Sequence, residues 1–188
     1  EILGVFNHRQ TQLVFYDTPG YISKRDAMKQ EYKTLRETST TTITKADVVL
    51  LVVDSARLLS PKQQYIFSEM VKLSLFHCKK EVILILNKVD LVEPKSKLLD
   101  ITRQLVSIIN GIKLGEGRAH LAELDTTTFM ISAMKNDGVL DLKNYLLQIA
   151  EVKPWLLGDK NKDANGQRVI TNMTNEERVE EIVLEKLL

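Results

Sequence analysis

Three short polar stretches each follow an apolar run of the chain. They read Asp17-Thr18-Pro19-Gly20, Asn87-Lys88-Val89-Asp90 and Ser132-Ala133. A Pro-Gly turn beside an aspartate and a Ser-Ala pair are common on their own, so the prediction depends on all three and on their spacing. Together they are typical of a guanine-nucleotide switch.

The first stretch combines a carboxylate with a proline and a glycine. Asp17 would face a Mg²⁺ ion through water, because Mg²⁺ keeps several waters and takes few carboxylates. Gly20 has no side chain to keep its N–H from a γ-phosphate, and its φ freedom lets the peptide reorient when that phosphate leaves. We therefore predict a switch loop over residues 18–30, with GTP or GDP and Mg²⁺ as ligands. The alternative is a plain turn with an aspartate nearby.

The second stretch has the groups that distinguish guanine from adenine. The Asp90 carboxylate can accept two bonds from the ring N–H and the exocyclic amine of guanine, and such polar pairing rejects a wrong base by roughly 10⁴. The Asn87 amide would tie the loop together and meet the base edge, while the stem of Lys88 covers one face of the ring. The alternative is a polar turn between a strand and a helix.

The third stretch would complete the base site. Its backbone N–H groups, from Ser132, Ala133, Met134 and Lys135, would face the guanine O6. The side chain of Lys135 would lie against the other face of the ring.

The elements that must position these loops follow from hydrophobic periodicity. Three apolar runs, residues 48–53, 82–86 and 127–131, read as strands of a parallel sheet, the first covered on both faces. Helices are expected at residues 28–45, 60–76, 96–110 and 139–149. A hairpin of Ile2–Phe6 and Leu13–Tyr16, joined by the polar residues 7–12, precedes them. This pattern predicts an α/β fold with a doubly wound, mostly parallel sheet and one antiparallel edge strand, which binds ligands at the carboxyl ends of its strands.

Local signals refine these helices. Ser60-Pro61-Lys62-Gln63 is a capping box with proline at the first helical position. Residues 111–117 contain three glycines and read as a loop. The inward side chains are expected to be Tyr65, Ile66, Met70 and Leu73 in one helix and Leu140, Leu142, Leu146 and Leu147 in another.

Composition limits the classes of protein that this chain can represent. It has 188 residues, 44% hydrophobic and 27% charged, with a net charge of +1, which suits one globular domain with an appended segment. The single cysteine, Cys78, excludes an internal disulfide, and we expect a structural role for it. We predict a nucleotide-binding domain over residues 1–150 and a linker over 151–173. A further domain would start at 174–188, where Thr174-Asn175-Glu176-Glu177 is a capping box.

The motifs resemble those of the Era family of TRAFAC GTPases. The closing residues EEIVLEKLL, Glu180–Leu188, are similar to an Era signature, and the linker at Lys153-Pro154-Trp155 looks like that of the mitochondrial members. The resemblance implies a P-loop GTPase fold over residues 1–150. It also implies that residues 174–188 form the first helix of a KH-type RNA-binding domain.

The resemblance further implies an activity and partners. These are GTP hydrolysis to GDP and phosphate, and assembly of the small ribosomal subunit through binding of its rRNA. A monomer in the mitochondrial matrix is implied, with the cytoplasm as alternative, and a peripheral contact with the inner membrane stays open. Two other functions remain: an Era-related GTPase of tRNA modification, and a nucleotide-binding scaffold without hydrolysis.

The chain lacks two loops of the family pattern. It contains no GxxxxGK(S/T) phosphate loop and no KH-type GXXG loop. We expect the first upstream of Glu1 and the second beyond Leu188, and hence an internal fragment that is inactive alone. Tyr21 stands where Ras-like enzymes have a glutamine that orients water, so no catalytic residue is assigned and slow intrinsic hydrolysis, about 10⁻⁴ to 10⁻³ s⁻¹, is expected.

Overall fold

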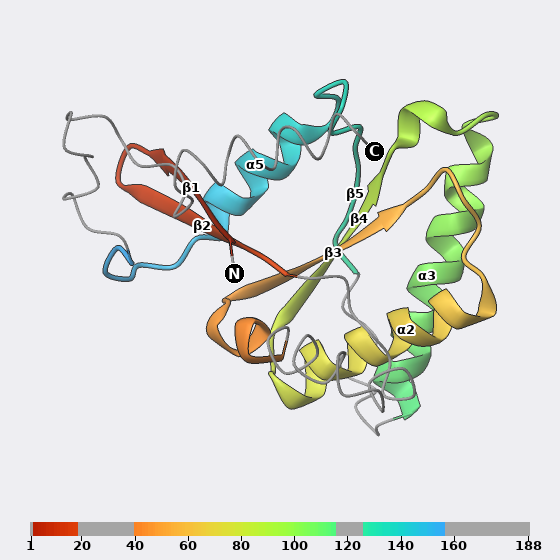
Figure 1. The fold of residues 1–188 in the computed structure, drawn as a ribbon, viewed down its shortest axis with the longest axis horizontal. Coiled ribbons are helices and arrows are strands. Elements are labelled where there is room, and N and C mark those ends of the chain that lie inside the picture. The colour runs from red at the N-terminus through yellow and green to blue at the C-terminus, as the bar shows by residue number, and fades with distance from the viewer. Residues whose placement is uncertain (1, 19–39, 116–125, 157–188) are drawn as a thin grey trace. The chain divides into compact units, whose positions relative to one another are not determined.

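The computed structural model describes residues 2–18, 40–115 and 126–156 (Figure 1). The chain divides into two compact units, Glu1–Thr18 with Tyr145–Leu188, and Pro19–Asn144. Each unit is described by itself.

The first unit contains a hairpin of β1 (Ile2–His8) and β2 (Thr11–Asp17). The two strands pair antiparallel, as predicted, but the expected six-residue connection is wrong. Asn7 and Gln12 continue the ladder, and the Gln12 amide donates to Asn7 Oδ1 at 3.1 Å, so only two residues turn the chain. In the same unit, the Trp155 indole N–H donates to the Gln10 carbonyl at 3.2 Å.

The second unit contains a parallel sheet. Its strands β3 (Val48–Asp54), β4 (Glu81–Asn87) and β5 (Thr128–Met130) lie in the order β3-β4-β5. The predicted α/β fold with a parallel sheet and an antiparallel pair is confirmed, with the pair in a sheet of its own. Asp54 lies opposite Asn87, so the strands β3 and β4 end together.

The core of this unit lies between β3, β4 and two helices (Figure 1). The helices are α2 (Pro61–Lys72), continued by a π-helical turn η2 (Leu73–His77), and α3 (Ser96–Gly115). Val82–Leu86 of β4 are all buried, because β4 is the central strand. The prediction that β3 is covered on both of its faces is wrong, because Val52 is 61% exposed.

The start of α2 follows the predicted capping box. Gln63 N donates to Ser60 Oγ at 3.3 Å, and Ser60 N donates to Gln63 Oε1 at 2.9 Å. The predicted inward face is wrong at Tyr65, which is exposed, since the stripe that reaches the core is centred on Phe67 and Val71. Ile66, Met70 and Leu73 are half-buried beside it.

Helix α3 is longer than predicted. Its buried stripe continues at steps of four through Leu105, Ile109 and Lys113, so packing extends the helix through Gly111 and Gly115. The predicted loop over residues 111–117 is therefore wrong as far as Gly115.

The last described helix is α5 (Val139–Gln148). Leu142 and Leu146 are buried as predicted, whereas Leu140 is 57% exposed. Residues 40–45 are helical, as predicted, and the remainder of that predicted helix lies outside the described residues. The linker beyond Leu156 and the closing helix at 174–188 also lie outside them. None of the described helices has the length and apolar character needed to cross a membrane.

Candidate nucleotide-binding site

Asn87 joins the loops that follow β4 and β5. Its Oδ1 accepts hydrogen bonds from Lys88 N at 2.8 Å and from Ala133 N at 3.0 Å. These donors lie in segments far apart in the sequence, and the parallel sheet brings them together at one edge. The second and third predicted motifs therefore form one cluster.

The turn after Asn87 has a defined backbone. Lys88 takes the left-handed conformation with φ 63°, which is costly for a residue with a side chain. A short 3₁₀ turn, η3 (Val89–Leu91), follows. Val89 N donates to the Ile131 carbonyl at 3.2 Å, and Lys95 Nζ donates to the Val89 carbonyl at 2.7 Å. These bonds hold the unusual conformation of Lys88 in place.

Asp90 provides a charged acceptor at the same place. Its side chain is only 10% exposed. A hydrogen bond from Ser132 lowers the pKa of Asp90 against the opposing effect of burial, helped by the positive charges of Lys135 and Lys95. Lys135 Nζ lies 3.8 Å from Asp90 Oδ2. Asp90 is thus ionised at neutral pH, as an acceptor of two guanine N–H groups must be.

The loop after β5 uses most of its own backbone donors. Ser132 and Asp137 exchange two backbone hydrogen bonds across it, and Lys135 N donates to Ser132 Oγ at 3.2 Å. Ala133 N is already bound to Asn87. Met134 is 94% exposed, and its N–H has no acceptor in the described part of the chain. Of the N–H groups predicted to face the guanine O6, that of Met134 is the one left available.

Asp54 also lies in this cluster, although sequence reasoning did not select it. Its Oδ2 lies 3.0 Å from Lys88 Nζ, and its Oδ1 accepts from Ala56 N at 3.0 Å. The hydrogen bond from Lys88 is the main reason that the pKa of Asp54 is lowered. The signal available in the sequence was its place at the end of an apolar run, whereas its position opposite Asn87 comes from the pairing of the strands.

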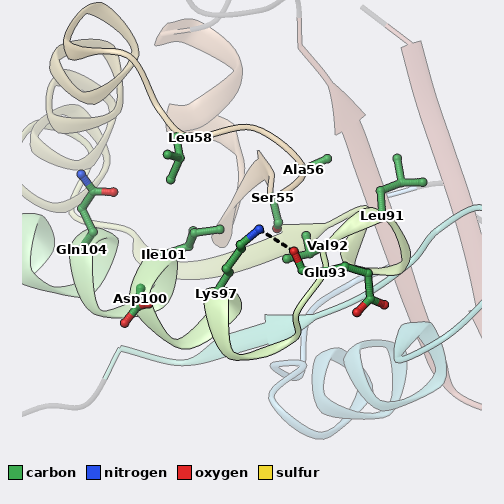
Figure 2. A pocket seen from close by; sticks show the side chains of 10 residues that line it. All are labelled: Ser55, Ala56, Leu58, Leu91, Val92, Glu93, Lys97, Asp100, Ile101 and Gln104. Carbon is green, nitrogen blue, oxygen red and sulfur yellow. Dashed lines mark hydrogen bonds between the residues drawn. The ribbon is translucent and has the colours of Figure 1, made fainter.

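A pocket of about 560 Å³ lies beside the turn at Val89–Leu91 (Figure 2). Its walls are mainly apolar, and the Lys97 ammonium donates to the Glu93 carbonyl within it. The Ser55 hydroxyl is buried there without a hydrogen-bond partner among the described residues, although Ser55 N donates to the Asn87 carbonyl at 2.9 Å. The lining residues are Ser55, Ala56, Leu58, Leu91, Val92, Glu93, Lys97, Asp100, Ile101 and Gln104.

The first predicted motif is only partly described. Asp17 ends β2 and is exposed, as is Thr18, and both belong to the first unit. Pro19, Gly20 and Tyr21 lie outside the described residues. No group of three or more His, Cys, Asp or Glu side chains forms a metal cluster among the described residues. A nucleotide-bound Mg²⁺ needs only one or two carboxylates besides phosphate oxygens and water, and the exposed carboxylate of Asp17 fits that requirement.

Cys78 is partly buried, next to the core. Burial raises the pKa of its thiol, against the lowering effect of Lys80. The thiol is therefore protonated at neutral pH, which agrees with the predicted structural role.

The chain is similar to known GTPases over its whole length. Residues 1–88 match the family model "50S ribosome-binding GTPase". The GTP-binding protein ERG of Antirrhinum majus is 30% identical over 100% of this chain and 40% of its own length. The mitochondrial GTPase Era of Salmo salar is 28% identical over 99% of this chain and 50% of its own length. The chain thus spans half or less of these relatives.

Two solved structures have the same fold. The first is Era in complex with MgGDPNP and nucleotides 1506–1542 of 16S ribosomal RNA, with a TM-score of 0.60 and 22% identity over 92% of this chain and 49% of its own. The second is a point variant of Aquifex aeolicus Era bound to GDP and AlF4⁻, with a TM-score of 0.64 and 24% identity over 98% of this chain and 53% of its own. Both support an Era-type GTPase fold for this chain.

Proposed function

Because this chain belongs to the Era family of GTPases, we propose that the full-length protein binds GTP and GDP with Mg²⁺ and hydrolyses GTP. The observation that carries the proposal is the double hydrogen bond to Asn87 Oδ1, which joins the two loops of the base site. A polar turn without a ligand would not need a second loop 46 residues away fixed against it.

In this proposal each residue of the cluster has a part in recognising the base. The Asp90 carboxylate accepts from the guanine ring N–H and its amine, and the Met134 N–H donates to O6. The stems of Lys88 and Lys135 cover the two faces of the ring. Adenine offers neither the donor pair nor the O6 acceptor, so it would leave the Asp90 carboxylate and the Met134 N–H unpaired.

Hydrolysis is proposed to follow the usual phosphoryl transfer to water. Water attacks the γ-phosphorus, the bond to the β–γ bridging oxygen breaks, and GDP leaves with inorganic phosphate. Asp17 would hold Mg²⁺ through water and Gly20 would donate its N–H to the γ-phosphate, with Thr18 and Pro19 in the same switch. Tyr21 has no amide to orient the attacking water, so we expect slow turnover without a partner.

We further propose that the protein binds small-subunit rRNA and acts in assembly of that subunit. The support is the Era structure that contains nucleotides of 16S ribosomal RNA, together with the relatives named Era. The mitochondrial Era of fish supports a mitochondrial location, and the matrix is proposed as the compartment. Fractionation with a matrix marker tests the location; monomeric state and membrane contact stay predictions.

The guanine site is tested by changing Asp90 to Asn in the full-length protein. The amide turns one acceptor oxygen into a donor, so preference should move from GDP to XDP, whose base has a carbonyl in place of the amine. GDP affinity should fall by about 100-fold or more, given the cost of leaving buried polar groups unpaired. Calorimetry with GDP, XDP and ADP measures the three affinities.

Asp100→Asn serves as the matched control. Asp100 is an exposed carboxylate on α3, outside the base cluster, so its change should leave the GDP to XDP ratio unaltered. An unchanged ratio in Asp90→Asn would remove the assignment of the guanine site. Binding of GTP with no phosphate release, even with small-subunit rRNA present, would favour the scaffold without hydrolysis.

A further inference from the structure

We propose that Asp54 is a positioning residue that holds the side chain of Lys88 extended over the base site. The proposal deepens, and rests on, the guanine-nucleotide function proposed above. It adds a residue at the end of β3 to a site otherwise formed by the loops after β4 and β5.

Lys88 is fixed at both of its ends. Its backbone N–H is held by Asn87 Oδ1 at 2.8 Å in a left-handed conformation, and its ammonium lies 3.0 Å from Asp54 Oδ2. Between these two points lie only the methylene groups of the side chain. Those groups are the part of lysine that can cover the flat face of a base. The contact between Lys88 Nζ and Asp54 therefore fixes the path of the methylene stem as well as the position of the ammonium group.

Asp54 is itself held in place. Its Oδ1 accepts from Ala56 N at 3.0 Å, which leaves Oδ2 to face Lys88. It ends β3 directly opposite Asn87, and Ser55 N donates to the Asn87 carbonyl at 2.9 Å. The two partners thus belong to adjacent strand ends with a fixed separation. The lowered pKa of Asp54, caused mainly by the bond from Lys88, agrees with a persistent pair.

The solvent exposure of the Asp54–Lys88 pair indicates whether it acts on folding stability or on nucleotide binding. The side chains of Lys88 and Asp54 are 52% and 37% exposed, and ion pairs at that depth contribute little to folding. A free lysine side chain, however, loses rotamer freedom when it orders against a ligand, and a side chain ordered beforehand does not. The pair should therefore act on nucleotide release more than on stability.

Asp54→Asn in the full-length protein tests the proposal. The amide oxygen can still accept from Ala56 N, while the attraction for the ammonium is lost. We expect dissociation of fluorescent mant-GDP to become about two- to fivefold faster. The melting temperature should stay unchanged, because an ion pair this exposed contributes little to folding. Asp100→Asn, which removes an exposed carboxylate beside Arg103, is the control and should not alter release.

Two further measurements separate positioning from a structural role. In a Lys88→Met background, which keeps an apolar stem without the charge, Asp54→Asn should add no further acceleration. Raising NaCl from about 0.05 to 0.5 M should speed release more from the wild type than from Asp54→Asn, because salt screens an exposed pair that the variant lacks. Asp54→Glu should restore part of the wild-type rate.

The outcomes also distinguish this inference from the function on which it rests. Wild-type protein that fails to bind GDP would contradict the proposed function. Wild-type binding together with an unchanged release rate in Asp54→Asn would overturn only the role of Asp54. Equal acceleration in the wild-type and Lys88→Met backgrounds would also overturn it, since Asp54 would then act without the lysine ammonium.

Discussion

At the residue scale, the candidate site is built around two short side chains that accept hydrogen bonds from another loop. Asn87 accepts from Ala133 N, and Asp90 accepts from Ser132. Asn87 ends β4 and Asp90 follows it, while both donors follow β5. The chain's own hydrogen bonds therefore organise the base site, which reduces the ordering cost of binding.

Removal of the Ser132 hydroxyl should raise the pKa of Asp90. The folded-state pKa lies below the ordinary value of 3.8, chiefly because of the bond from Ser132. The ionised carboxylate therefore contributes to stability above that value, and the contribution is lost as pH falls through the folded pKa. In Ser132→Ala this loss should begin at higher pH. A carboxyl-carbon NMR titration of Asp90 measures the shift.

Ser55→Ala is the control for that experiment. Ser55 is buried like Ser132, but its hydroxyl has no partner in the part of the chain that the structure describes, and Ser55 is not among the groups that shift the pKa of Asp90. Its substitution should leave the titration of Asp90 unmoved. An unaltered pKa in Ser132→Ala would show that the Ser132 bond does not hold Asp90 in its ionised form.

At the scale of elements, the loop between β5 and α5 depends on backbone geometry that the motif alone does not reveal. Asn136 and Gly138 both have positive φ, 54° and 68°, and together they close the loop that presents Ala133. A Cβ on Gly138 would lie 2.5 Å from the carbonyl oxygen of Met130. The end of β5 and the start of α5 are therefore too close for any other residue without a shift of backbone.

Gly138→Ala should destabilise the protein. The left-handed backbone alone costs about 1–2 kcal/mol for an alanine, and the contact with the Met130 carbonyl adds to it. Because the same loop supplies Ala133 N, GDP affinity should fall as well. Urea unfolding and GDP calorimetry on the full-length protein measure the two effects.

Gly111→Ala is the opposite case and the control. Gly111 lies inside α3, and a Cβ there meets no atom of the described residues within 4 Å. Alanine should stabilise the helix by about 0.5–1 kcal/mol. A stabilising Gly138→Ala, or a strongly destabilising Gly111→Ala, would contradict this description of the two glycines.

At the scale of the whole molecule, the second unit depends on one apolar core between β3, β4, α2 and α3. Leu105 of α3 is fully buried in it, whereas Leu99 of the same helix is 56% exposed. Leu105→Ala should lower the free energy of unfolding by about 2–5 kcal/mol, because it removes buried methyl groups and leaves a cavity. Leu99→Ala should change it by less than about 0.5 kcal/mol.

Chemical denaturation of both leucine variants in the full-length protein checks this difference. GDP affinity, measured where each variant is fully folded, should stay at the wild-type value, since neither side chain lies in the base cluster. Equal destabilisation by the two changes would mean that the buried face of α3 is assigned wrongly.

The sequence by itself determined the parts of this protein that local chemistry controls. Continuous apolar runs predicted β3, β4 and β5, and the Ser60 to Gln63 spacing predicted the start of α2. The Asn87 and Ser132 motifs predicted two loops, which the hydrogen bond from Ala133 N to Asn87 Oδ1 joins. Strand periodicity and helix capping are short-range, so a few neighbouring residues suffice to predict them.

Only the tertiary structure decided what depends on neighbours from elsewhere in the chain. The inward face of α2 is centred on Phe67 and Val71, and α3 continues through Gly111. Packing against the core determines which side chains are buried and how far a helix continues, and it overrides local helix propensity. The pairing of Asp54 with Lys88 follows from the register of β3 against β4, which neither segment encodes alone. Residues that contribute to the site from a distance become visible only when the sheet brings the strand ends together.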